Sequence, residues 1–266
     1  MAVIVFTSAA GAPGATTASL GLALTWPRHV LLADCDREPA QSVQAGYLRG
    51  MDHGGRGLMT LAHLHREGHP LAPELWRQTL PLAEGTDVQR RFLPGFTSPG
   101  AARLFEHVWP ALGESFEALD PQGVDVLIDA GRLSTTGLPL GMLSAADVVL
   151  LTVRSSLRSL AGARIHLPTL RDQLAALPQQ VAVGLVVVGP ERPYSAAEIS
   201  AQFAAPVWAE VPWEPRSAEV LSDGEREPRK FFEGSFMGRM RADAKSLSER
   251  LTRARQAAAL VTGGAR

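Results

Sequence analysis

The chain has 266 residues, of which 45% are hydrophobic and 20% are charged, and this balance excludes a disordered protein. Its formal net charge of -1 excludes bulk attraction to nucleic acid or to an anionic membrane, so any such surface must be a local patch. The single cysteine, Cys35, has no partner for an internal disulfide, which agrees with a reducing compartment, and we expect a cytoplasmic protein.

Short apolar runs rich in Val, Leu and Ile recur along the chain, separated by helix-like stretches. None of the runs alternates cleanly between apolar and polar residues, as expected for strands of a parallel sheet covered by helices on both faces. The sequence therefore predicts an α/β fold with a doubly wound, mostly parallel sheet flanked by helices. The expected strands are Val3 to Phe6, Val30 to Ala33, Val124 to Ile128, Val148 to Val153, Val181 to Val188 and Val207 to Val211.

Helices are expected between these strands, and two of them contain a proline. Pro110 predicts a kink or a break, and Pro168 predicts an interruption, because proline cannot donate the helical hydrogen bond. We expect a single domain over residues 1–266, with an irregular connection over about 41–95 and a C-terminal helix over about 236–261. The other expected helices are Thr16 to Leu24, Ala101 to Leu119, Leu157 to Leu177 and Ala196 to Phe203.

The loop after the first expected strand is the most informative segment. It opens a helix, so its backbone N–H groups and the helix end form a potential phosphate site. In the pattern G-x-x-x-x-G-K-[ST], Gly14 and Thr16 keep the second glycine and the hydroxyl, whereas Ala15 stands at the lysine. The loop alone fits a tight turn without a ligand equally well. Its sequence is Ser8-Ala9-Ala10-Gly11-Ala12-Pro13-Gly14-Ala15-Thr16-Thr17.

Aspartates follow two of the expected strands. One strand ends Ala33-Asp34-Cys35-Asp36, and another ends in Asp129. Ligands of open α/β sheets bind at the carboxyl ends of the strands, so we expect Asp36 and Asp129 near the loop. The alternative is that Asp34 or Asp36 merely caps the following turn.

The loop resembles the deviant Walker A motif of the ParA/MinD family of P-loop ATPases, K-G-G-x-G-K-[ST]-[ST]. Alanine replaces both lysines, at Ala10 and Ala15, and Ala12 replaces the second glycine. In the family, the first lysine reaches the partner subunit's nucleotide and the second contacts the β- and γ-phosphates. The positions that agree with the motif are Gly11, Gly14, Thr16 and Thr17.

The resemblance runs from Val3 to about Gly224 and implies a site for ATP or ADP with Mg²⁺. Asp36 would orient the attacking water, and Pro212 and Trp213 would lie near the adenine. Arg91-Phe92-Leu93-Pro94-Gly95, followed by a long helix, is most similar to the CpaE/TadZ branch. The implied Mg²⁺ ligands are Thr16, Asp36 and Asp129. The implied nucleotide-binding loop consists of Gly11, Ala12, Pro13, Gly14, Ala15, Thr16 and Thr17.

The two missing lysines weaken the expected chemistry. Each charge-assisted contact to phosphate is worth roughly 1.5–3 kcal/mol, and hydrolysis also needs preorganised cations. We therefore expect a ParA/MinD-like positioning or regulatory protein with weak or absent nucleotide binding and little ATP hydrolysis. It would form a homodimer and act with protein partners of a positioning or secretion system.

Two alternatives stay open. An active ATPase would need substitute cations, for which Arg37, Arg132, Arg154 and Arg158 are candidates because they follow strand ends. A DNA-binding partition protein would use the basic C-terminal helix. A DNA or membrane surface on that helix is not favoured, since such charges usually form a solvated helix face.

Overall fold

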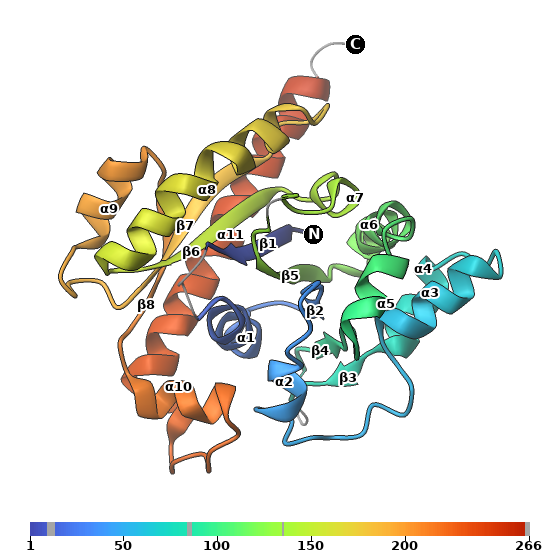
Figure 1. Ribbon diagram of the computed structural model, residues 1–266, viewed down its shortest axis with the longest axis horizontal. Coiled ribbons are helices and arrows are strands. Elements are labelled where there is room, and N and C mark those ends of the chain that lie inside the picture. The colour runs from blue at the N-terminus through green and yellow to red at the C-terminus, as the bar shows by residue number, and fades with distance from the viewer. Residues whose placement is uncertain (10–13, 84–86, 135, 264–266) are drawn as a thin grey trace.

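The computed structural model describes residues 1–9, 14–83, 87–134 and 136–263, with side chains as far as residue 257 (Figure 1). It confirms the predicted α/β fold with an eight-stranded sheet in the order β3-β4-β2-β5-β1-β6-β7-β8. Among the described strand pairs only β3 with β4 is antiparallel. The strands are β1 (Val3–Ser8), β2 (Val30–Asp34), β3 (Leu80–Pro81), β4 (Arg90–Leu93), β5 (Asp125–Arg132), β6 (Val148–Arg154), β7 (Ala182–Val188) and β8 (Val207–Val211).

None of the described helices is both long enough and apolar enough to cross a membrane. The α-helices are α1 (Ala15–Thr25), α2 (Ser42–Ala45), α3 (Leu58–Arg66), α4 (Ala72–Leu75), α5 (Pro99–Leu104), α6 (Trp109–Glu117), α7 (Leu140–Leu143), α8 (Leu157–Ala175), α9 (Ala196–Phe203), α10 (Pro215–Ser222) and α11 (Ser235–Gly263). Three 3₁₀ turns, η1 (Trp76–Gln78), η2 (Asp120–Gln122) and η3 (Phe231–Glu233), complete the described elements.

The two proline predictions have different outcomes. The break is confirmed, because α5 and α6 are separate helices and Pro110 lies in the first turn of α6, where its missing N–H costs nothing. The interruption at Pro168 is wrong, because α8 continues through it. Proline inside a helix removes one hydrogen bond, and the packing of Leu167 and Leu170 on the sheet offsets that loss.

The connection over residues 41–95 is more regular than expected. It contains α2, α3, α4 and two strands, of which β4 pairs in parallel with β2 and β3 forms the antiparallel edge. The hydrophobic pattern does not predict β4, because this strand begins with Arg90 and Arg91 and only Phe92 and Leu93 are buried. Strands this short carry no periodicity from which a prediction can be made.

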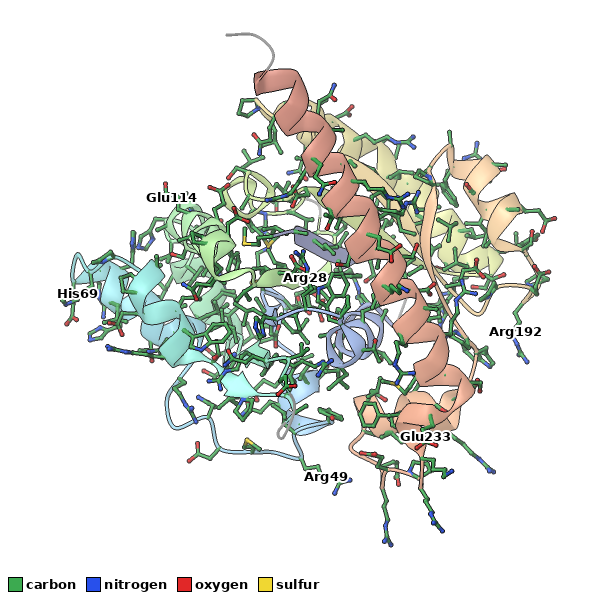
Figure 2. All side chains as sticks on the ribbon, turned by 180° about the vertical axis from the view of Figure 1, so that it is seen from behind. Arg28, Arg49, His69, Glu114, Arg192 and Glu233 are labelled. Carbon is green, nitrogen blue, oxygen red and sulfur yellow. The ribbon has the colours of Figure 1, made fainter. Side chains whose placement is uncertain are left out.

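Two hydrophobic clusters lie on opposite faces of the sheet, because successive side chains of a strand point to opposite sides. In β1, Val3 and Val5 belong to one cluster, with apolar residues of α3 to α9. Ile4 and Phe6 belong to the other, with residues of α1, α2, α10 and α11. Figure 2 shows α11 lying across this second face. Both faces of β1 are therefore covered, which explains its unbroken apolar sequence.

The order of the strands places the loop after β1 at a topological switch point. β1 lies between β5 and β6, but the chain continues from β1 through α1 to β2, beyond β5. The connection from β5 to β6 passes on the opposite face, by way of α7. The carboxyl ends of β1, β2 and β5 thus meet around the N-terminus of α1, where open α/β sheets bind ligands.

The amino ends of the strands are joined by a buried carboxylate that is paired with a partly exposed arginine. Asp125, fully buried at the start of β5, accepts hydrogen bonds from the Ala2 backbone N–H at 2.6 Å and from the Trp26 indole N–H at 2.8 Å. Arg28, labelled in Figure 2, donates to both carboxylate oxygens. One side chain therefore connects β1, the end of α1 and β5 at the edge opposite the switch point.

Candidate functional site

The N-terminus of α1 begins at a glycine next to the switch point. Gly14 is the N-cap residue, with φ 117°, a backbone conformation that other residues rarely adopt. A Cβ at this position would also approach Val188 to 3.3 Å. Among the described residues no side chain caps the helix, and its first turn has no acidic residue, so nothing in this part of the chain neutralises the positive end of the helix. Gly11, Ala12 and Pro13 lie outside the described residues.

A cavity of about 380 Å³ opens in front of this helix end. The structure brings together here most of the described residues that the sequence predicted for the phosphate site, namely Gly14, Ala15, Thr16, Thr17 and Asp36. Other walls come from β5 and from two short helices that no motif marked. These contribute Gly131, Arg132, Ser42, Leu221, Ser222 and Asp223.

Asp129, also predicted for this site, is not among the residues that line the cavity, but it contacts Thr16, which does line it. The Thr16 hydroxyl donates a hydrogen bond to the Asp129 carboxylate, and the Gly131 N–H donates another at 3.0 Å. Burial raises the pKa of Asp129, and these two hydrogen bonds oppose the rise. The Thr16 hydroxyl and the Asp129 carboxylate therefore form one hydrogen-bonded unit.

Asp36 packs against the end of β5. A Cβ on Gly131 would overlap the Asp36 carboxylate and displace it, and the φ of 62° at this position favours glycine. Burial raises the pKa of Asp36 to about 6 with a contribution from Asp129, whereas the N–H of Glu38 and the charge of Arg132 lower it. Asp36 also accepts the Glu38 N–H at 2.9 Å, so it caps the following turn as well as lining the cavity.

Asp34, the first aspartate of the pair after β2, stands directly beside Asp129 in the sheet register. The pKa of Asp34 is raised from 3.8 to about 8, first because burial removes water from its carboxyl group and second because Asp129 is negative. A hydrogen bond from the Asp36 N–H opposes the rise. Gly95, after β4, allows the backbone to approach this carboxyl group, since a Cβ would lie 2.6 Å from its Cγ.

The raised pKa of Asp34 predicts that the metal-free protein loses stability with rising pH. Because the folded form holds a proton that the unfolded form has released, unfolding becomes easier between about pH 4 and about pH 8. We expect the Tm in EDTA to fall across this range and the fall to shrink in Asp34→Asn. Exposed Asp87 is the control, and Asp87→Asn should reproduce the wild-type slope. An unchanged slope in Asp34→Asn would contradict the assignment.

A second cavity, of about 370 Å³, also borders Gly14 and Thr17 and is otherwise lined mainly by the ends of β6 to β8 and by α10. Pro212 and Trp213, the residues predicted to lie near a base, line it. The Arg154 guanidinium lies over the Trp213 ring, 4.6 Å from its centroid. The two cavities flank the helix end, as a phosphate site and a base site of one nucleotide would.

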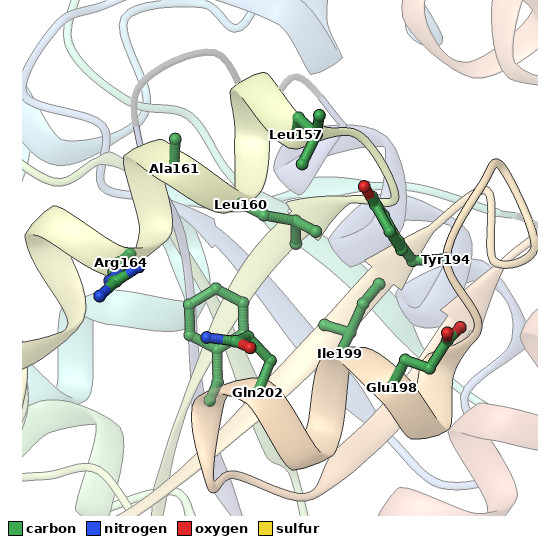
Figure 3. Close-up of a pocket in the computed structure, with 9 residues that line it drawn as sticks. Leu157, Leu160, Ala161, Arg164, Tyr194, Glu198, Ile199 and Gln202 are labelled. Carbon is green, nitrogen blue, oxygen red and sulfur yellow. The ribbon is translucent and has the colours of Figure 1, made fainter.

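A hollow of about 500 Å³ between α8 and α9 has a different character (Figure 3). Leu157, Leu160, Ile199 and Phe203 make it largely apolar. The Glu198 carboxylate accepts hydrogen bonds from the Ser195 N–H and hydroxyl and so caps the N-terminus of α9. This hollow offers no arrangement of charges for a phosphate or a metal.

The basic residues of α11 are mostly engaged within the molecule. Arg239 pairs with Asp243 and Glu210, and Arg255 pairs with Asp147. The Arg250 guanidinium lies over the Trp208 ring at 4.4 Å. The others are Arg241 on the Phe232 carbonyl, Lys245 near Glu249, and Arg253 on the Glu249 carbonyl. These contacts favour a structural role for the charges over a nucleic-acid surface.

The site fits a magnesium nucleotide better than a bare polyphosphate. Its described lining carries two carboxylates, Asp36 and Asp223, against one cation, Arg132, so a bound polyanion needs a counter-ion. Among the described residues, no group of three or more His, Cys, Asp or Glu side chains is arranged to hold a metal. Mg²⁺ suits such a place, since it keeps several waters and takes few protein ligands.

Solved structures similar to this chain include ParA/MinD-type ATPases. A ParA family ATPase from Chlorobium tepidum TLS matches with a TM-score of 0.70 and 13% identity, over 91% of this chain and 98% of its own. MinD in the MinC:MinD cell division complex of Aquifex aeolicus matches at 0.70 and 16%, over 94% and 96%. The septum site-determining protein MinD from Pyrococcus horikoshii OT3, complexed with Mg-ADP, matches at 0.62 and 18%, over 94% and 95%.

These likenesses establish the fold, which is that of the ParA/MinD-type P-loop ATPases. No protein-family model matches the chain, and no curated protein matches it. The N-terminus of α1 and the aspartates of β2 and β5 lie at the switch point of that fold.

Proposed function

We propose that this chain is a ParA/MinD-like positioning or regulatory protein with weak or absent nucleotide binding and little ATP hydrolysis. We call the cavity of about 380 Å³ in front of α1 the phosphate cavity. The observation that carries the proposal is that Ala15 lines this cavity as the first residue of α1, where the P-loop pattern has lysine. The cavity, the uncapped helix end and the aspartates support a former or residual nucleotide site. The missing cation supports the loss of efficient catalysis.

The residues suited to a magnesium nucleotide are those that the two cavities bring together. The backbone of Gly14 to Thr17 would hold the phosphates, and Pro212 and Trp213 would contact the base. The Thr16 hydroxyl, Asp36 and Asp129 would hold Mg²⁺, in part through water, and the ion would supply positive charge next to the phosphates. If hydrolysis persists, Asp36 is the group placed to orient the attacking water.

The proposal includes the family assignment and the partners. The deviant Walker A loop and the segment at residues 91–95 support a ParA/MinD-like protein of the CpaE/TadZ type. A homodimer acting with protein partners of a positioning or secretion system follows from that assignment. The presence of MinD in a complex with MinC shows that a protein of this fold engages such a partner.

Calorimetry with ATP and Mg²⁺, together with a steady-state assay for released phosphate, tests this proposal. We expect binding weaker than micromolar, or none, and turnover near background, because the preorganised lysines are absent. Light scattering with and without nucleotide measures the homodimer in the same samples. Micromolar affinity with rapid turnover would overturn the proposal.

A further inference from the structure

The phosphate cavity has a single cationic side chain among its described lining residues, Arg132. It is exposed and is the last residue of β5. The register pairs it with Ser8, the end of β1, and the following N–H, of Leu133, bonds the Ser8 carbonyl. Arg132 is thus anchored through its backbone next to the strand that leads into the phosphate loop.

The other candidate cations are placed elsewhere. Arg37 bonds the Ser134 hydroxyl at 2.9 Å and the Gly137 carbonyl, so its guanidinium stabilises the loop after β5. Arg154 stacks on Trp213 in the second cavity. Arg158 is exposed and lines neither of the two cavities. Of the four candidate arginines, Arg132 is therefore the one that lines the phosphate cavity.

The guanidinium of Arg132 is available for a ligand. Its charge acts on the nearby Asp36 carboxylate, but no hydrogen bond or ion pair holds the guanidinium within the described part of the chain. Arg132 does not make the cavity positive, because the two carboxylates of Asp36 and Asp223 line the same cavity. The planar guanidinium of an arginine can donate hydrogen bonds to two phosphate oxygens at once, whereas the ammonium group of a lysine acts as a point charge.

We propose that Arg132 is the cation that contacts the phosphates of a magnesium nucleotide in this cavity, in place of the lysine missing at Ala15. This inference rests on the proposed function and narrows it, because it requires weak but measurable binding rather than none. Arg132 would bind and position the phosphates from β5, opposite the helix end. Its charge would enter the cavity from β5, whereas the lysine of a P-loop stands at the start of the helix that corresponds to α1.

The test is a set of calorimetric titrations with MgADP, which measure binding independently of turnover. We expect Arg132→Gln to weaken binding by roughly 10-fold or more, and Arg132→Lys to retain part of the affinity because it keeps the charge without the fork. Arg158→Gln is the matched control, since it removes the same charge from the same edge of the sheet outside both cavities. Its affinity should stay within about twofold of wild type.

A second arm tests whether Arg132 substitutes for the lysine. In the Ala15→Lys background, Arg132→Gln should cost less affinity than in the wild-type background, because the two cations serve the same phosphates and their effects are not additive. Phosphorus NMR of bound MgADP gives an independent readout, with the β-phosphate resonance displaced in Arg132→Gln. Since Arg132 is exposed, its variants should melt near the wild-type temperature.

The outcomes separate this inference from the proposed function. Equal losses in Arg132→Gln and Arg158→Gln would show a general charge effect and overturn the role of Arg132. Undetectable binding to the wild type at millimolar MgADP would also overturn it, while leaving a nucleotide-free positioning protein intact. Tight binding with rapid turnover would instead overturn the proposed function, even if Arg132→Gln abolished the binding.

Discussion

Ala15→Lys is expected to tighten MgADP binding by roughly 10- to 100-fold, as charge-assisted hydrogen bonds to phosphate are worth about 1.5–3 kcal/mol. Ala15 is the first residue of α1, it is buried, and it lines the phosphate cavity. A lysine side chain at this position extends into a space that already contains Asp36 and Asp223. Calorimetry of MgADP binding to the two proteins measures the effect directly.

The control for Ala15→Lys is Ala15→Met, which adds a side chain of similar length without charge. If the cation is responsible, Ala15→Met should bind no better than wild type, and any obstruction of the cavity should weaken it. The benefit of Ala15→Lys should also fall in rising salt, because part of it is a charge interaction. Equal affinities for the two variants would show that the cavity does not place phosphate next to residue 15.

Asp125→Ala is expected to destabilise the fold by about 2–5 kcal/mol, because the buried N–H groups of Ala2 and Trp26 lose their acceptor at about 1–3 kcal/mol each. Arg28 adds less to this loss, since its side chain is 39% exposed and can be hydrated again. The Asp125 carboxylate is fully buried and accepts from Ala2, Trp26 and Arg28. Its loss leaves the indole N–H of a buried tryptophan and a guanidinium without their acceptor. Chemical unfolding monitored by tryptophan fluorescence measures the free energy of unfolding.

Asp147 is a matched control for Asp125. It also bonds the backbone N–H of β1, at Val3, and it pairs with an arginine, Arg255. Its side chain is 21% exposed, whereas that of Asp125 is 0% exposed, so water can replace part of what Asp147→Ala removes. We expect a clearly smaller loss for Asp147→Ala. Comparable losses would show that burial does not set the strength of these pairs.

Much of the fold could be predicted from the apolar runs. Six of the eight strands coincide with runs of Val, Leu and Ile, since a strand covered on both faces is apolar throughout. The two missed strands lie near the edge, where β3 has two residues and β4 begins with two arginines. The predicted interruption at Pro168 is wrong because local propensity does not include the packing of α8 against β6 and the core.

The chain itself determined which groups are available to the site: Gly14 for a left-handed N-cap, Thr16 for a hydroxyl, aspartates at two strand ends, and alanine where a P-loop has lysine. Only the tertiary structure decided which of them meet. Because β5 inserts between β1 and β2, Asp129 lies against both Thr16 and Asp34, and Arg132 alone of the four candidate arginines lines the described phosphate cavity. The order of strands in a sheet depends on long-range pairing, which residue spacing along the chain does not encode.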